Sequence, residues 1–246
     1  MTCWRLFLVA LLAGGVAGIS GFGIGSLLTP LLAVRYGAKL AVAIVSVPHV
    51  VATAARFVGL RKHLDKKVFL NFGILSAAGG LAGALLNARA NSPTLAMVFG
   101  CLLVFAGISG LTGFIDRMRF GRRMAWIAGA LSGFFGGLVG NQGGIRSAAL
   151  LGFQIRKEAL VATATAIGLI VDGARMPVYL AVQHRGILSA WPLLIASVAG
   201  VLLGTFWGVR ILRQIPEKIF RRLLYILILA LGLYMLFHGI RMQDER

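Results

Sequence analysis

Acidic residues are scarce in this sequence: 7 Asp and Glu stand against 25 Lys and Arg in 246 residues. A water-soluble domain of this size would need a far more charged surface, so a soluble fold is excluded. The formal net charge is +18. The basic residues lie in the short joints between apolar runs, where membrane topology places them, so we expect no nucleic-acid partner.

Cysteine and histidine are also rare. Cys3 and Cys101 stand alone, which excludes a disulfide framework. A metal transporter would need clusters of Asp, Glu, His or Cys in its apolar runs, and the few that lie there, His49 and Asp172 among them, stand far apart in the sequence. We therefore expect neither a metal nor a cofactor. Long polar linkers are lacking as well, so no separate soluble domain is expected.

Apolar segments fill the chain, with 59% hydrophobic residues and a mean hydropathy of +0.89. Six runs have the length of about 20 residues that a helix needs to cross a bilayer. They are 38–59, 68–88, 94–115, 159–182, 190–209 and 219–240. A signal peptide is the rival interpretation of the N-terminal run. That run lacks a clean small-residue cleavage pattern, so we expect it in the mature protein. The sequence predicts an all-α, multi-pass protein of the cell inner membrane.

The chain repeats itself at an offset of 119 residues. The segment GISGFGIGSLLTPLL (18–32) aligns with GLVGNQGGIRSAALL (137–151), so that glycines fall on glycines. Arg56 aligns with Arg175 at the same offset. Two arginines aligned inside apolar runs are difficult to attribute to chance similarity.

Small residues recur four positions apart later in each half, at an offset of 121. Gly79 and Gly83 fall on Gly200 and Gly204, a spacing that predicts close helix packing. We divide the chain into a first membrane repeat (1–115), a basic cytoplasmic joint (116–124) and a second membrane repeat (125–246).

The two remaining apolar runs, 4–34 and 125–155, hold 31 residues each. A straight helix of that length would measure about 46 Å, against a hydrocarbon core of about 30 Å. Each run is either one tilted crossing, giving eight plain spans, or a re-entrant hairpin with glycines at its tip. Apart from Arg56, Arg146 and Arg175, the basic residues divide 12 to 10 across the membrane in the eight-span model.

The hairpin model divides the same residues 7 to 15, which is the clear bias that membrane proteins show. It predicts two inverted repeats, each a re-entrant hairpin plus three transmembrane helices. Both termini then lie outside, and the hairpin tips meet near the midplane, where inverted-repeat transporters bind substrate.

At GFGIGSLLTPLL (21–32) and GNQGGIRSAALLGF (140–153) the chain resembles the sulfite exporter TauE/SafE family. The resemblance covers essentially the whole chain, although Ile24 interrupts the first glycine run and no proline corresponds to Pro30. It implies a transporter of sulfite, an organosulfonate or a related small anion.

Polar side chains interrupt the second glycine cluster. A broken helix there would offer free backbone N–H groups and a helix N-terminus, which attract anions. Amide, hydroxyl and guanidinium groups would add donors. The expected substrate-binding residues are Asn141, Gln142, Gly143, Gly144, Arg146 and Ser147, with Gly21, Gly23, Gly25 and Ser26 from the first cluster. In the alternative interpretation, Arg146 extends to the lipid headgroups and Asn141 caps a helix.

Ionisable residues inside apolar runs are the remaining candidates. Asp172 and Arg175 are three residues apart, which places them on one helix face where they can pair. Arg175 is then an anion ligand or part of a purely structural pair, and Asp172 tunes it or carries a proton. His49 is a second proton-carrying candidate or a hydrogen-bonded packing residue. Arg56 lies close to the end of its run, so we expect it to extend to the membrane surface.

Three functions remain in competition. We expect a secondary transporter, with an exporter favoured, for a small anion and with protons as a coupling-ion candidate. A passive anion channel could use the same site. The distant alternative is an intramembrane serine protease, because GISG (18–21) would provide Ser20 as a nucleophile. The repeat places Val139 opposite Ser20 while keeping the glycines, which favours a structural role and a protein that is not an enzyme.

Overall fold

The computed structural model describes residues 3–20, 23–89, 92–114, 122–140 and 157–212, together with Arg146, Leu150 and single positions between 216 and 237. Within these ranges the chain is almost entirely helical and contains no strand. The helices are α1 (Cys3–Ser20), α2 (Ile24–Leu60), a 3-10 turn η1 (Arg61–His63), α3 (Lys66–Arg89), α4 (Ser92–Leu111), α6 (Arg122–Val139), α8 (Lys157–Ser189) and α9 (Trp191–Leu212).

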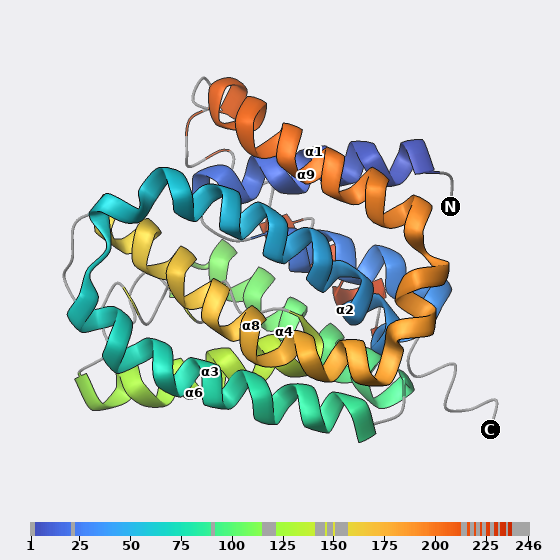
Figure 1. The fold of residues 1–246 in the computed structure, drawn as a ribbon, viewed down its shortest axis with the longest axis horizontal. Helices are drawn as coiled ribbons and strands as arrows, with labels where there is room; N and C mark the ends of the chain where they lie inside the picture. Colours follow the sequence, from blue (N-terminus) through green and yellow to red (C-terminus); the bar gives the residue numbers. More distant parts are fainter. Residues whose placement is uncertain are drawn as a thin grey trace.

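The first long apolar run is broken rather than straight. Helix α1 ends at Ser20, and α2 begins at Ile24 after Gly23, whose φ of 133° favours glycine. A second break lies inside α2 at Gly37, with φ 73°. In Figure 1 the segment of α2 before Gly37 runs back beside α1, and the segment after it reverses again.

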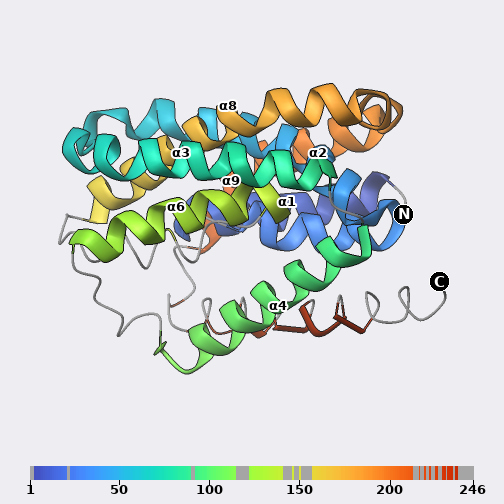
Figure 2. The same cartoon turned by 90° about the horizontal axis from the view of Figure 1, so that it is seen from below.

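The bounds of α1 and α6 differ by 119 residues at both ends, the same offset at which the sequence aligns. The helix pairing exchanges partners between the halves. Helix α1 packs against α9, and α3 packs against α6, with α2 and α8 crossing between these pairs (Figures 1 and 2). Helix α3 of the first half therefore packs on α6, which begins the described part of the second half, and α9 of the second half packs on α1 of the first.

Glycines permit these two close pairings. A Cβ added at Gly79 or Gly83 would meet the backbone of α6, and one added at Gly200 or Gly204 would meet the backbone of α1. The prediction that these glycines form helix-packing faces is confirmed.

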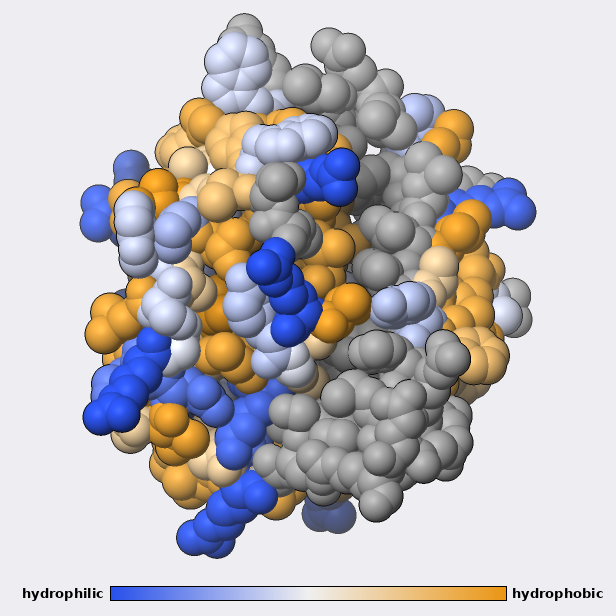
Figure 3. Space-filling view, turned by 90° about the vertical axis from the view of Figure 1, so that its right-hand side faces the viewer, coloured by the Kyte–Doolittle hydropathy of each residue, from blue (hydrophilic) through white to orange (hydrophobic). Residues whose placement is uncertain are grey.

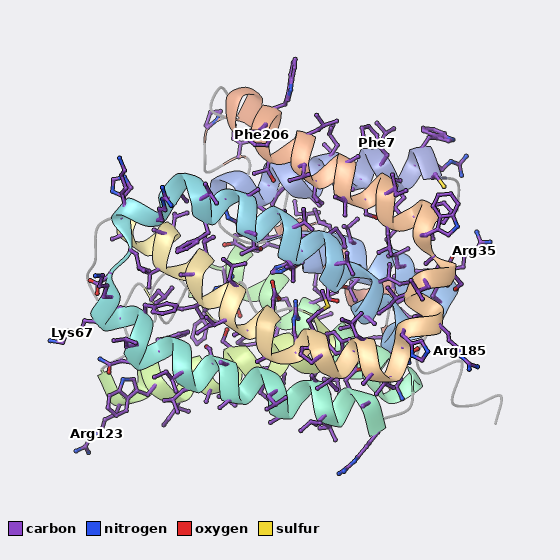
Figure 4. The ribbon with its side chains drawn as sticks, in the orientation of Figure 1. Phe7, Arg35, Lys67, Arg123, Arg185 and Phe206 are labelled. Atoms are coloured by element: carbon purple, nitrogen blue, oxygen red, sulfur yellow. The ribbon has the colours of Figure 1, made fainter. Side chains whose placement is uncertain are left out.

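Basic residues occupy both ends of the bundle. Figure 4 shows Arg35 and Arg185 at the end where α1 begins, and Lys67 and Arg123 at the opposite end. Figure 3 looks onto the first of these ends, where hydrophilic side chains are scattered among apolar ones.

The long apolar helices agree with a membrane protein. Among the residues that the structure describes, three helical segments are long and apolar enough to span a bilayer: Ile24–His63, Lys66–Arg89 and Val161–Ser189. Four shorter apolar helices accompany them: Cys3–Gly18, Gly100–Leu111, Trp126–Val139 and Trp191–Trp207. Large apolar side chains such as Phe206 and Trp207 lie exposed on the outer surface, where lipid rather than water suits them.

Candidate anion-binding site

The glycine breaks of the two halves meet in the interior. Gly140 follows the end of α6 with φ 76°, as Gly23 precedes α2 with φ 133°. A Cβ at Gly25 would meet the carbonyl oxygen of Gly140, and a Cβ at Gly140 would lie 3.3 Å from Thr29 Oγ1. Only a residue without a side chain allows this approach, so the two clusters form one junction.

Two repeat-related arginines bind repeat-related carbonyls at this junction. Arg56 Nη1 donates to the carbonyl oxygen of Ala17, and Arg175 Nη1 donates to that of Gly136. Both pairs are related by the offset of 119 residues. Ala17 and Gly136 lie in the last turns of α1 and α6, where the helix dipole favours cations. The Gly136 carbonyl oxygen also accepts from the backbone N–H of Gly140 at 3.1 Å.

Two further side chains donate hydrogen bonds to carbonyl groups in the last turn of α6. Tyr179 Oη donates to the carbonyl oxygen of Gly137, and Asn87 Nδ2 donates to that of Leu138 at 2.8 Å. Both side chains are 1% exposed. The sequence interpretation missed these two residues, because nothing local to them indicates which helix end they reach.

The predicted surface position of Arg56 is wrong. Its side chain lies inside the protein, 8% exposed, and its Nε donates to Thr165 Oγ1 of α8 at 3.2 Å. A carbonyl-rich helix end within reach satisfies its donors, so the guanidinium does not extend to the headgroups.

Asp172 is the centre of a buried polar chain. Its Oδ1 accepts from Arg175 Nε at 2.9 Å and lies 2.6 Å from Arg175 Nη2, which confirms the pairing predicted from their spacing. Its Oδ2 lies 2.7 Å from His49 Nδ1, across the contact between α2 and α8. Every carboxylate oxygen therefore has a partner, as a buried charge requires.

Arg146 has a different environment. Its side chain is buried, with the residue 2% exposed, so it does not extend to the outer surface of the protein. Its Nε and Nη1 find no hydrogen-bond partner within the part of the chain that the structure describes, and neither does the buried Thr53 Oγ1. The guanidinium lies beside Gly168 of α8, where an added Cβ would be 3.2 Å from Nη1 and 3.4 Å from Thr53 Cγ2.

This environment is the repeat-related counterpart of the His49–Asp172 contact. The offset of 119 residues relates His49 to Gly168 and Asp172 to Thr53. One of these two related contacts thus pairs an imidazole with a carboxylate, while the other places a glycine beside the methyl group of a threonine. The guanidinium of Arg146 lies beside Gly168, the position that corresponds to His49 in the first half. The two halves of the junction therefore share a backbone arrangement but carry different side chains at equivalent positions.

Several expected ligands lie outside the described residues: Gly21, Asn141, Gln142, Gly143, Gly144 and Ser147. The side chain of Ser20 is likewise outside them. Gly23 and Gly25 lie at the first break, and Ser26 follows them on α2, 4% exposed. Thr29 is fully buried, and its Oγ1 has no partner among the residues described.

A comparison with protein families matches residues 6–235 to the model for the sulfite exporter TauE/SafE. The chain belongs to the TauE/SafE family. Members of this family are membrane transporters rather than enzymes, and sulfite export gives the family its name. No curated protein and no solved structure matches the chain. Membership and the long apolar helices together identify a multi-pass membrane transporter of the TauE/SafE type.

Proposed function

We propose that this TauE/SafE protein is a secondary transporter that exports a small sulfur oxyanion, such as sulfite or an organosulfonate, across the inner membrane. The anion binds at Arg146, between the glycine breaks of the two halves. The observation that carries this proposal is a fully enclosed guanidinium whose Nε and Nη1 have no partner in the described part of the chain.

Leaving such donors unpaired is expensive. A buried polar group without a partner costs about 1–3 kcal/mol, and a charged group costs more. An oxyanion between Arg146 and Thr53 would accept from the guanidinium and from the Thr53 hydroxyl, and so remove this cost. The glycine at position 168 leaves room for the guanidinium beside α8.

The charge of the surroundings also favours an anion. Arg56, Arg175 and Asp172 lie close enough for their charges to interact with that of Arg146. Three guanidinium groups thus face one carboxylate, and the excess positive charge is buried in an apolar bundle. Arg175 contributes to this field, while its Nε and Nη1 are engaged by Asp172 and Gly136. We therefore assign the direct contact to Arg146 and a supporting role to Arg175.

We further propose that the halves are inverted repeats, each with a re-entrant hairpin and three crossings, and with both termini outside. Two observations support this. Arg35 lies at the same end as Arg185 and opposite Lys67, which agrees with the hairpin model and disagrees with eight plain spans. The exchange of partners between α1–α9 and α3–α6 is what a two-fold axis relating the halves would produce. The hairpin tips would then meet where Gly25 contacts Gly140.

The proposal is tested by sulfite flux into proteoliposomes that contain the purified protein. Arg146→Ala should abolish saturable flux, and Arg146→Lys should recover only part, because a single ammonium replaces the planar guanidinium. Arg123→Ala is the matched control, since Arg123 is an exposed arginine at the end of the bundle. Full activity of a folded Arg146→Ala protein would refute the site, and an ohmic sulfite current would indicate a channel.

A further inference from the structure

The hydrogen bond between His49 and Asp172 fixes the tautomer of the imidazole. A carboxylate that also pairs with Arg175 is ionised and can only accept, so His49 Nδ1 must carry the hydrogen of the 2.7 Å contact. The second ring nitrogen, Nε2, is then the position where a proton can be gained or lost. Protonation at Nε2 leaves the bond to Asp172 intact.

Among His49, Asp172 and Arg175, His49 is also the residue best placed to exchange a proton. Its side chain is 11% exposed, against 1% for Asp172 and 2% for Arg175. Asp172 is held by two partners, so a proton on the carboxylate would disrupt both contacts. An imidazole is the side chain whose charge changes most readily near neutral pH.

The charged groups around His49 relate its proton to the anion site. Asp172 and Arg175 face it from α8. The guanidinium of Arg146 lies beside Gly168, one helical turn before Asp172 on the same helix. Arg56 lies two turns further along α2. With no anion bound, the guanidinium charges of Arg146 and Arg175 oppose a further positive charge on the imidazole. An anion at Arg146 offsets that repulsion.

From this geometry we infer that His49 takes up a proton at Nε2 when an anion binds at Arg146 and releases it when the anion leaves. The proton comes from water on the loading side and returns to water on the release side, and only the N–H bond forms and breaks. The transporter then moves the anion together with a proton. This inference rests on the proposed function.

Linkage makes the two binding events reciprocal. Anion affinity must increase as the pH falls through the titration of His49, by up to about tenfold per pH unit for one linked proton. A purely structural hydrogen bond between His49 and Asp172 would leave anion affinity independent of pH.

The test is calorimetry of methanesulfonate binding, because this organosulfonate does not titrate near neutral pH. Titrations in two buffers with different heats of ionisation give the number of protons taken up per anion. His49→Asn keeps an amide donor toward Asp172 but cannot take up the proton. His63→Asn is the matched control, since His63 is exposed in η1.

For the wild type and for His63→Asn we expect the uptake of up to one proton per bound anion. For His49→Asn we expect no proton uptake. Equal proton uptake in all three proteins would overturn this inference and leave the anion site standing. If methanesulfonate and sulfite both fail to bind the wild type, the proposed function falls, and the inference falls with it.

A second measurement covers a His49→Asn protein that does not fold. Methanesulfonate added to wild-type protein in weakly buffered solution should raise the pH, which an indicator dye reports. Binding without any change in pH would overturn the inference from the wild type alone.

Discussion

Gly168→Ala is the most informative substitution at the junction, because stability and transport should change in opposite directions. The added methyl group would lie 3.2 Å from Arg146 Nη1 and 3.4 Å from Thr53 Cγ2. The first distance is shorter than ordinary van der Waals contact, so the guanidinium must retreat by a few tenths of an ångström. Since Arg146 Nη1 is at the end of a flexible side chain, it can do so without unfolding the helix.

The expected magnitudes follow from helix propensity and from charged hydrogen bonds. Replacing a glycine inside α8 by alanine should stabilise that helix by up to about 1 kcal/mol. Hydrogen bonds to charged groups contribute about 1.5–3 kcal/mol. Loss of about 1 kcal/mol of that contact to the anion corresponds to a rise of about fivefold in the KM for sulfite. The melting temperature should therefore stay level or increase while transport weakens.

Gly173→Ala is the matched control, because Gly173 lies in the same helix and an added Cβ would meet nothing within 4 Å. It should gain the same helix propensity and transport sulfite like the wild type. Both variants are compared by sulfite flux in proteoliposomes and by thermal unfolding in detergent. A Gly168→Ala protein with an unchanged KM would show that the guanidinium beside Gly168 does not contact the anion.

Three further predictions concern topology, packing and the buried ion pair. In a protein whose own cysteines are replaced, Arg35→Cys and Arg185→Cys should react with an impermeant maleimide from the same side of the membrane, and Lys67→Cys from the other side. Labelling of Lys67→Cys from the same side as Arg185→Cys would support eight plain spans instead. Gly83→Val should lower the melting temperature sharply, because its side chain would meet the backbone of α6, whereas Gly59→Val, with nothing nearby, should have little effect. Asp172→Asn and Arg175→Gln should each cost about 3–5 kcal/mol of stability by leaving a buried charge without its partner. The double variant should lose less stability than the sum of the two single losses. It should still be less stable than the wild type, since the Gly136 carbonyl loses the charged donor of Arg175. Stability losses that add up in thermal unfolding would contradict the pairing.

Local patterns in the sequence predicted the features that depend on one helix. The three-residue spacing of Asp172 and Arg175 predicted their ion pair, and the four-residue spacing of Gly79 and Gly83 predicted a packing face. Both follow from helix periodicity, which places such residues on the same side whatever surrounds them. The long apolar runs predicted the all-helical architecture for the same reason.

Contacts between the halves could not be read in this way. The partner of His49 lies 123 residues further along the chain, and only the packing of α2 on α8 brings them together. Arg56 was misplaced because its position near the end of an apolar run says nothing about a carbonyl from α1 within its reach. Its alignment with Arg175 was a usable signal, since related residues tend to meet related neighbours.

Thr53 and Gly168 were missed altogether. Neither residue type indicates a binding site by itself, because threonine and glycine are common in membrane helices. The signal that would have found them is again the repeat: they are the counterparts of Asp172 and His49, the residues that had been singled out. A repeat used residue by residue is therefore more informative than one used only to divide the chain.

The pairing of α1 with α9 has a consequence for biosynthesis. Helix α1 begins at Cys3, while its partner ends at Leu212, so nearly the whole chain must leave the ribosome before the glycine face of α9 can cover α1. Until then the surface of α1 that packs on α9 has no partner helix in the translocon or in lipid. The surface of α3 likewise has no partner until α6 is made. Contacts so distant along the chain form slowly. Assembly is thus postponed to the end of synthesis, and a chain truncated before α9 would leave α1 without its partner and open to pairing with another molecule.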